Sequence, residues 1–274
     1  MTAAGDRDRR LECVINVSEG RDGAVLDALA AAAGATLLDL HKDADHHRCV
    51  LTLGGPAVEE AARRVATTAV ATVDLRRHSG AHPRLGSLDV VPFVPLDGAP
   101  LAGALEARNR FARWAADELG LPCFLYGPER SLPEVRRRSF AALAPDTGPP
   151  RPHPSAGAVA VGARPPLVAY NLWLVTDDPA VARSLAAELR GPHVRSLGFS
   201  LGSAVQVSFN LLSPSEVGPM QVYDAVSSRT GVARAELVGL LPSAVLDAIP
   251  PERWHQLDLA ADRTIESRLD AASR

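Results

Sequence analysis

The sequence predicts a protein of the α/β or α+β class, in which helices cover one face of a mixed β-sheet. Its 274 residues are enough for one large domain or two modest ones. Hydrophobic residues make up 46% of the chain, so a sizeable core can form and disorder is disfavoured. Short apolar runs alternate with amphipathic segments along the whole length, and this alternation indicates layers of strands and helices.

Strands of the first half are predicted from short apolar runs bounded by polar or glycine-rich turns. These runs are Leu11–Val17, Ala35–His41, Arg48–Gly55, Asp89–Leu96 and Pro122–Gly127. The fourth run contains Pro92 and Pro95, and proline cannot donate a ladder hydrogen bond. We therefore expect that strand to lie at an edge of the sheet or to be irregular.

Helices of the first half are predicted between these strands. One begins near Gly23, where Ser18 or Asp22 supplies the cap. A second opens at Pro56, because proline is favoured at the first helical position. A third covers Leu101–Leu119, where apolar residues recur at helical spacing.

A segment rich in proline and glycine divides the chain. Residues 144–157 contain five prolines and two glycines, which is the composition of a loop. We therefore predict two domains, residues 1–157 and 158–274. The elements expected in the second half are a strand from Leu167, a helix opened by Pro179, a strand at Ala204–Leu212, a helix around Val217–Ser228 and a final charged helix.

The two halves share a short pattern of an apolar strand, a turn and a helix that starts with P-A-V. It occurs as VLTLGGPAV in the first half and as LWLVTDDPAV in the second. Because the match is short, it indicates either an internal repeat or a coincidence.

Composition excludes several classes of protein. The chain has 29 basic and 32 acidic residues, and the net charge of −3 argues against a protein that coats nucleic acid. Residues 1–10 lack the apolar region of a signal peptide, and no stretch reaches the roughly 18 apolar residues of a membrane span. The three cysteines are widely spaced, which disfavours a disulfide scaffold or a cysteine zinc site. We expect a soluble cytoplasmic protein.

The densest group of polar residues is DLRRHSGAHPRLGSLD, residues 74–89. His78 and His82 are four residues apart, but Gly80 and Pro83 favour a loop over a helical metal-binding pair. A histidine in this loop is either a surface residue or a general base. Because the Walker A, G-x-G-x-x-G, G-x-S-x-G and H-E-x-x-H patterns are missing from the sequence, ATP-binding, dinucleotide-binding and serine-hydrolase functions lose support.

Two further segments carry polar residues at the ends of predicted strands. DLHKDADHHR, residues 39–48, suits either a divalent metal or a solvated hairpin turn, and Asp39 and His41 should share one face of a strand. NVSEG, residues 16–20, lies just before a predicted helix N-terminus. Such a place binds anions or polar ligands, although an ordinary helix cap has the same pattern.

These segments occur together in the formiminotransferase domain family, which the chain resembles over nearly its whole length. The stretches that carry the resemblance are CVINVSEGRD, DLHKDADHHRCVLTLGG, HSGAHPRLGSLDVVPFVP, GPPRPHPSAGAVAVGARPPLVAYN, VSFNLLSPSEVGPMQVYDAV and ELVGLLP. The third is the most specific, because it matches H-x-G-x-H-P-R-x-G-x-x-D-x-x-P-F-x-P. The resemblance implies an α+β fold of two subdomains, each a mixed sheet with helices on one face, a ligand cleft between them, and a homodimer.

The resemblance also implies a reaction. A formimino group moves from N-formimino-L-glutamate to tetrahydrofolate, giving 5-formiminotetrahydrofolate and glutamate, which is a step of histidine breakdown. Tetrahydrofolate is then the co-substrate, and no metal is needed. His82, the second histidine of H-x-G-x-H-P-R, matches the family's general base, which removes a proton as N5 attacks the formimino carbon.

Other site residues are assigned by their positions in the matching motifs. Asp39 and His41 join His82 in the catalytic group. The substrate-binding group is Asn16, Ser18, Glu19, Arg48 and Arg84, where the guanidinium groups suit the carboxylates of a glutamate. The folate-binding group is Gly148, Pro149, His153, Pro154 and Gly157, within a stretch whose backbone would hold the pterin.

The chain departs from the family pattern at Ile15, His41, His47 and Ala156, which we expect at or near the site. No counterpart of the cyclodeaminase domain of bifunctional members is expected. The departures leave two alternatives beside formimino transfer from formiminoglutamate. One is a related one-carbon or amidine transferase or hydrolase with a different donor, and the other is a non-catalytic folate-binding protein.

Overall fold

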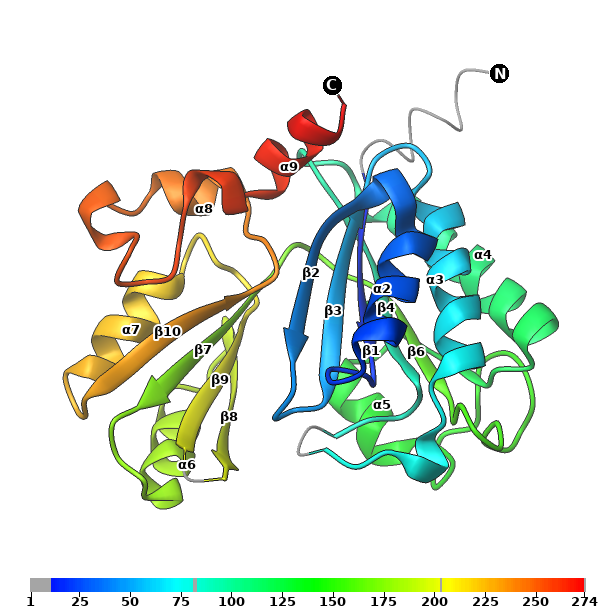
Figure 1. Ribbon diagram of the computed structural model, residues 1–274, viewed down its shortest axis with the longest axis horizontal. Coiled ribbons are helices and arrows are strands. Elements are labelled where there is room, and N and C mark those ends of the chain that lie inside the picture. Colours follow the sequence, from blue (N-terminus) through cyan, green and yellow to red (C-terminus); the bar gives the residue numbers. More distant parts are fainter. Residues whose placement is uncertain (1–10, 81–82, 203, 274) are drawn as a thin grey trace. The chain divides into compact units, whose positions relative to one another are not determined.

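The five apolar runs of the first half and one strand from the segment after the proline-rich loop together form a six-stranded sheet (Figure 1). Across the sheet the order is β2 (Leu37–Asp43), β3 (Arg48–Gly54), β1 (Leu11–Val17), β4 (Leu88–Pro95), β6 (Val159–Ala163) and β5 (Cys123–Tyr126). Neighbours from β2 to β4 are antiparallel, whereas β4, β6 and β5 are parallel, so the sheet is mixed as predicted. The computed structural model describes residues 11–80, 83–202 and 204–273.

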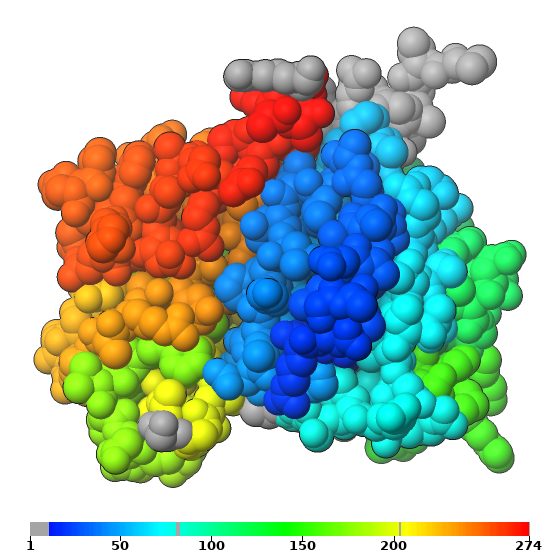
Figure 2. Space-filling view, in the orientation of Figure 1, coloured from blue at the N-terminus to red at the C-terminus, as the bar shows by residue number. Residues whose placement is uncertain are grey.

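Helices cover both faces of this sheet to different extents. The helices on the main face are α2 (Gly23–Ala33), α3 (Val58–Thr72) and α4 (Leu101–Leu119), and the first two lie side by side on the surface shown in Figure 2. The short helix α5 (Leu132–Arg138) packs Val135 against Phe124 and Ala160 on the opposite face. The prediction of helices on one face therefore fails at β5 and β6, because parallel strands are apolar on both sides.

Alternation along β1 separates a core face from a polar face. Cys13, Ile15 and Val17 are fully buried against the helices, whereas Asn16 points to the other face. Ile15 was expected at or near the site, but its side chain belongs to the helix-side core. The reason is the two-residue period of a strand, which sends neighbouring side chains to opposite faces.

The proline-containing strand β4 is an interior strand, lying between β1 and β6, and the prediction of an edge position was wrong. The register explains how it tolerates proline. Cys13 pairs with Phe93 and Asn16 pairs with Val90, so the pairing with β1 is interrupted at Pro92. Pro92 has no N–H to donate, and it lies where β4 makes no regular pair with β1.

The second unit is built on a four-stranded sheet. Its order is β10 (Val232–Val238), β7 (Val168–Leu174), β9 (Ala204–Leu211) and β8 (Val194–Leu201). All of its pairings are antiparallel, so the prediction of a mixed sheet was wrong for this unit. The helices α6 (Pro179–Glu188) and α7 (Pro219–Ser227) pack on one face, and the chain continues through α8 (Ser243–Asp247) to α9 (Ile265–Ala272). Short 3-10 turns complete the fold at Gly34–Thr36, Leu75–Arg77, Pro251–Arg253 and Ala261–Arg263.

The division between the two units falls between Pro165 and Pro166. The sequence prediction placed the boundary after Gly157 and assigned the next apolar run to the second domain. In the structure this run is β6, which pairs in parallel with both β4 and β5 and so stays in the first unit.

The element order β-α-β-β-α-β occurs in both units, as β1 to β4 in the first and β7 to β10 in the second. The P-A-V segments do not mark equivalent places in this order. The first follows β3, the third strand of its unit, and the second follows β7, the first strand of its unit. The short sequence pattern therefore does not align the two units.

Candidate active site

Three connections meet at one edge of the first sheet, because β1 and β2 end there and β4 begins there. They are residues 18–22, residues 44–47 and residues 73–87. Hydrogen bonds join them in pairs. Arg21 Nε donates to the Ala44 carbonyl at 2.8 Å, and Ser18 Oγ donates to the Gly86 carbonyl at 2.8 Å. The three polar motifs of the first half thus come together in space.

A small hollow that is open to solvent lies among these connections. The residues that line it are Asn16, Val17, Ser18, His46, His47, Arg48, Arg84 and Asp89. Four of the five predicted substrate-binding residues are among them. The fifth, Glu19, is joined to the hollow through a bond to His47.

Arg48 and Asn16 project from neighbouring strands on the sheet face opposite the helices. An Nη2 hydrogen of Arg48 is donated to Asn16 Oδ1, and Asn16 Nδ2 donates to the Val14 carbonyl at 3.1 Å. Burial lowers the pKa of the Arg48 guanidinium, while the negative charge of Asp89 opposes this shift. Because water is largely excluded there, a ligand carboxylate would interact more strongly with this cation than at an open surface.

The carboxylates of Glu19 and Asp22 accept backbone N–H groups in and after the turn between β1 and α2. Glu19 Oε1 accepts the backbone N–H groups of Gly20, Arg21 and Asp22 at 2.8, 2.7 and 3.0 Å. Burial acts to raise the pKa of Glu19, but these backbone bonds and His47 outweigh it and lower the pKa. Asp22, not Ser18, caps α2, since its carboxylate accepts from the second and third residues after it.

His47 and His78 stack with ring centroids 3.9 Å apart. His47 Nδ1 lies 2.8 Å from the Ser79 carbonyl oxygen, and His47 Nε2 lies 3.0 Å from Glu19 Oε1. His78 is neutral, because its Nδ1 accepts from Arg84. Burial, together with the nearby charges of Arg84 and His47, lowers the pKa of His78 to about 4. The two stacked rings lie beside the hollow, and His47 is one of the residues that line it.

Arg84 extends from the same loop. Its Nη1 group donates to His78 Nδ1, and its Nη2 group donates to the Gly80 carbonyl at 2.6 Å. Gly80 is packed closely, since a Cβ there would lie 2.7 Å from the His46 carbonyl oxygen and 2.8 Å from His47 Cβ. His82, the predicted general base, lies outside the described residues, and its role stays a prediction.

Asp89 holds the backbone of this loop. Its buried carboxylate accepts the Leu85 N–H at 2.6 Å and Arg136 Nη2 at 2.6 Å. Arg136 comes from α5 and also donates to the Pro83 carbonyl at 2.9 Å. Sequence reasoning missed Arg136, because nothing in the run Arg136–Arg138 distinguishes it from its neighbours.

Asp39 and His41 share one face of β2, as predicted. They pair with Thr52 and Val50 of β3, on the same sheet face as Arg48. The described residues that line the hollow do not include them. The structure therefore places them on the polar sheet face, away from the lining of the hollow itself.

The predicted folate-binding stretch is divided in the structure. His153 and Gly157 exchange backbone hydrogen bonds of 2.7 and 2.9 Å, with Pro154 in the turn between them, and Gly157 forms a bridge with Gly86. Gly148, with φ +87°, lies instead against Leu121 after α4, and Pro149 beside it is exposed. The end of this stretch meets residues 85–87, which directly follow the H-x-G-x-H-P-R segment.

Ala156 is one of the positions that depart from the family pattern. Its side chain is buried in the helix-side core. Its carbonyl accepts from Ser87 at 2.9 Å. The contact that it makes with the loop of the candidate site is therefore a backbone contact.

Within residues 11–80, 83–202 and 204–273, no group of three or more His, Cys, Asp or Glu side chains is arranged to hold a metal ion. In the same ranges no helix has the length and apolar character needed to cross a bilayer. Cys13, Cys49 and Cys123 are buried thiols that form no disulfide.

The chain is similar to known proteins over most of its length. The model of the formiminotransferase domain, N-terminal subdomain, matches residues 10–164. Glutamate formimidoyltransferase of Streptococcus pyogenes is 36% identical over 269 residues, which are 86% of this chain and 90% of that protein. Glutamate formimidoyltransferase of Thermoplasma acidophilum is 32% identical over 271 residues, with 86% and 89% covered.

A larger relative matches over part of its length. Formimidoyltransferase-cyclodeaminase of Gallus gallus is 36% identical over 278 residues, which are 87% of this chain and 51% of that protein. The fold and the comparisons together define an enzyme of the transferase class. The chain belongs to the formiminotransferase family.

Proposed function

We propose that this protein transfers the formimino group of N-formimino-L-glutamate to tetrahydrofolate, giving 5-formiminotetrahydrofolate and glutamate. The observation that carries the proposal is the meeting of Arg48, Arg84 and Asn16 in one hollow. Two guanidinium groups and an amide match the two carboxylates and the formimino nitrogen of such a donor. The names of the relatives agree with this chemistry.

The proposed residue roles follow the order of bond changes. N5 of tetrahydrofolate attacks the formimino carbon and forms a C–N bond, and the bond from that carbon to the glutamate nitrogen breaks. His82 takes the proton that N5 loses, and the departing glutamate nitrogen gains one. Asp39 and His41 complete the proposed catalytic group from the polar face of β2, where they lie on the same side as Arg48.

Proposed substrate contacts come from the three connections at the edge of the sheet. Arg48 and Arg84 hold glutamate carboxylates, with Asn16 beside them. Ser18 and Glu19 shape the backbone of the hollow, since their side chains bond to the Gly86 carbonyl and to the N–H groups of the following turn. For tetrahydrofolate, the support is strongest for the turn His153–Gly157, which adjoins Gly86.

The first test is a steady-state assay with formiminoglutamate and tetrahydrofolate. We expect turnover by the wild-type chain and its loss in His82→Ala, because the proton acceptor is removed. Arg84→Gln should raise the KM for formiminoglutamate, and an unchanged KM would remove Arg84 from the substrate-binding group. Folate binding without turnover would favour a different one-carbon donor or a non-catalytic folate-binding protein.

We further propose that the enzyme is a cytoplasmic homodimer that acts in histidine degradation. The support is the similarity to the family over most of the chain. Light scattering on the purified chain measures the oligomeric state, and a monomeric mass at working concentration would contradict the dimer.

A further inference from the structure

We propose that Arg136 is a positioning residue of the active site, which holds the Pro83–Leu85 backbone and thereby sets the place of Arg84 in the hollow. The proposal rests on the formimino-transfer function proposed above. Arg136 lies on α5, far along the chain from the motifs that line the hollow.

Arg136 contacts the backbone before Arg84 directly and the backbone after it through Asp89. Arg136 Nη1 donates to the carbonyl of Pro83 at 2.9 Å. Its Nη2 group donates to Asp89 Oδ2 at 2.6 Å, and Asp89 Oδ1 accepts the N–H of Leu85 at 2.6 Å. The residue before Arg84 and the residue after it are therefore both held by one guanidinium–carboxylate pair. His82 precedes Pro83 directly in the sequence.

Arg136 also determines which cation neutralises Asp89. The charge of Asp89 acts on Arg48 and on Arg84 as well, so one buried carboxylate lies within electrostatic reach of three arginines. Arg136 bonds to it through both of its terminal nitrogens. Without Arg136, the buried carboxylate would attract the substrate-binding arginines and compete with a substrate carboxylate.

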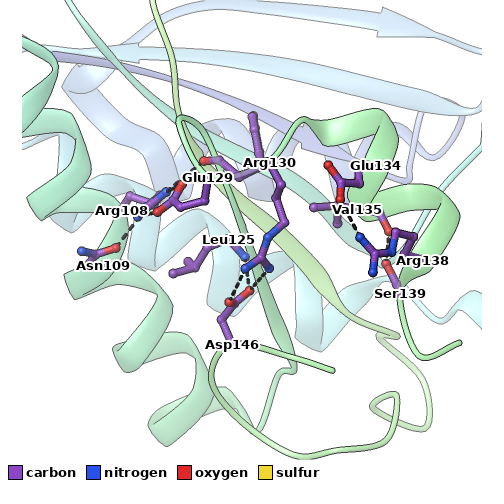
Figure 3. Close-up of polar contacts among 11 residues, drawn as sticks. Arg108, Asn109, Leu125, Glu129, Arg130, Glu134, Val135, Arg138, Ser139 and Asp146 are labelled. Carbon is purple, nitrogen blue, oxygen red and sulfur yellow. Dashed lines mark hydrogen bonds and ion pairs between the residues drawn. The ribbon is translucent and has the colours of Figure 1, made fainter. Parts of the chain in front are cut away.

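The base of α5 is anchored firmly enough for this role (Figure 3). Arg108, which is buried, donates to Glu129 Oε1 at 2.6 Å and Oε2 at 2.8 Å. Arg130 makes a similar pair with Asp146 at 2.8 and 3.0 Å. Paired guanidinium and carboxylate groups fix direction as well as distance, so the turn that leads into α5 is held in place.

The same helix provides a matched control. Arg138 lies on α5 two positions after Arg136 and donates to Glu134 at 2.7 Å, with about half of its side chain exposed. Its ion pair lies on the surface and, within the described residues, makes no hydrogen bond to the loop of the hollow. Arg138→Ala therefore removes an arginine from α5 without disturbing Asp89.

The experiment compares Arg136→Ala, Arg136→Lys and Arg138→Ala in the full chain. Amide hydrogen exchange of the peptide that contains Leu85 is measured together with kcat, KM and the melting temperature. We expect Arg136→Ala to speed exchange at Leu85, raise the KM for formiminoglutamate and lower kcat/KM roughly 100-fold. Millimolar guanidinium should restore part of the activity, Arg136→Lys should be intermediate, and Arg138→Ala should match the wild type.

Several outcomes would overturn the proposal. One is an active wild type in which Arg136→Ala and Arg138→Ala have the same kcat/KM. That result would refute the role of Arg136 but not the proposed function. Another is an amide exchange rate at Leu85 that is the same in Arg136→Ala as in the wild type. That result would refute the role of Arg136 whether or not the protein has activity. Exchange that accelerates evenly across the first unit would show a purely structural role. Absence of turnover in the wild type refutes the proposed function, whereas Leu85 exchange still decides whether Arg136 holds the loop.

Discussion

The two units have the same β-α-β-β-α-β order but differ at the corresponding edge of their sheets. In the first unit the connection from α3 to β4 runs from Val73 to Ser87 and carries the H-x-G-x-H-P-R motif. In the second unit the connection from α7 to β10 runs only from Ser228 to Gly231. There Val175, which is 70% exposed, donates its N–H to the Gly231 carbonyl at 2.9 Å.

The difference shows that the topology supplies an edge and the connections supply the chemistry. In both units the first strand ends where the last strand of the motif begins, so the connections meet in each case. Polar side chains line a hollow at this edge in the first unit. A fold shared by two halves of one chain therefore does not imply a shared function.

The largest expected effect concerns the anchor of the long connection. Asp89→Asn should lower the free energy of unfolding by about 3 kcal/mol, because Arg136 loses a buried charged partner. Arg229→Ala in the short connection of the second unit should cost less than about 1 kcal/mol, since the Arg229–Glu188 pair is on the surface. Chemical denaturation measures both values, and similar losses would remove the contrast between the two connections.

The next effect is on substrate binding. Arg48→Gln should raise the KM for formiminoglutamate roughly 10- to 100-fold, the value of a charge-assisted hydrogen bond. Val175→Asn, at the corresponding edge of the second unit, should leave this KM unchanged because its side chain faces solvent. Steady-state kinetics of both variants test the comparison, and an effect at Val175 as large as at Arg48 would contradict it.

A smaller effect is expected in the polar cluster of the second sheet. Glu236 Oε2 accepts from Trp173 Nε1 and Asn171 Nδ2, both at 3.0 Å, and the Arg234 guanidinium lies 4.2 Å from the Trp173 ring centroid. Trp173→Phe keeps an aromatic ring but removes the Nε1–H donor together with part of the buried indole, and the lost hydrogen bond to Glu236 should account for about 1 kcal/mol of the stability change. A double-mutant cycle with Glu236→Leu, which removes the acceptor, should give a coupling of similar size, and additive losses would contradict the role of this bond.

The effect that is smallest at neutral pH is a change in pH dependence, because it is seen only as the pH falls below about 6.5. Burial, Arg84 and His47 lower the pKa of His78 from 6.5 to about 4. Between these values the unfolded chain binds a proton that the folded chain does not, so His78 makes stability fall as pH falls from about 6.5 to 4. His78→Gln should flatten this part of the stability curve. Melting temperatures of the two proteins across this range give the answer, and parallel curves would show that His78 does not contribute.

The sequence by itself determined the elements whose signals are local. β1 at Leu11–Val17 and α4 at Leu101–Leu119 have the predicted bounds, since the alternation of a strand and the period of a helix are properties of a few neighbouring residues. The placement of Asp39 and His41 on one face of β2 follows from the same alternation. The grouping of three polar motifs, including Arg48 and Arg84, was also foreseen through the family resemblance.

Only the tertiary structure decided the features that depend on distant partners. Pro92 lies in an interior strand because the β1 ladder is interrupted opposite it, and β6 joins the first unit because β4 and β5 provide its partners. Arg136 meets Asp89 across 47 residues of sequence. A hydrogen bond between residues so far apart forms only when the intervening chain has folded, so no local pattern near Arg136 indicates which carboxylate it binds.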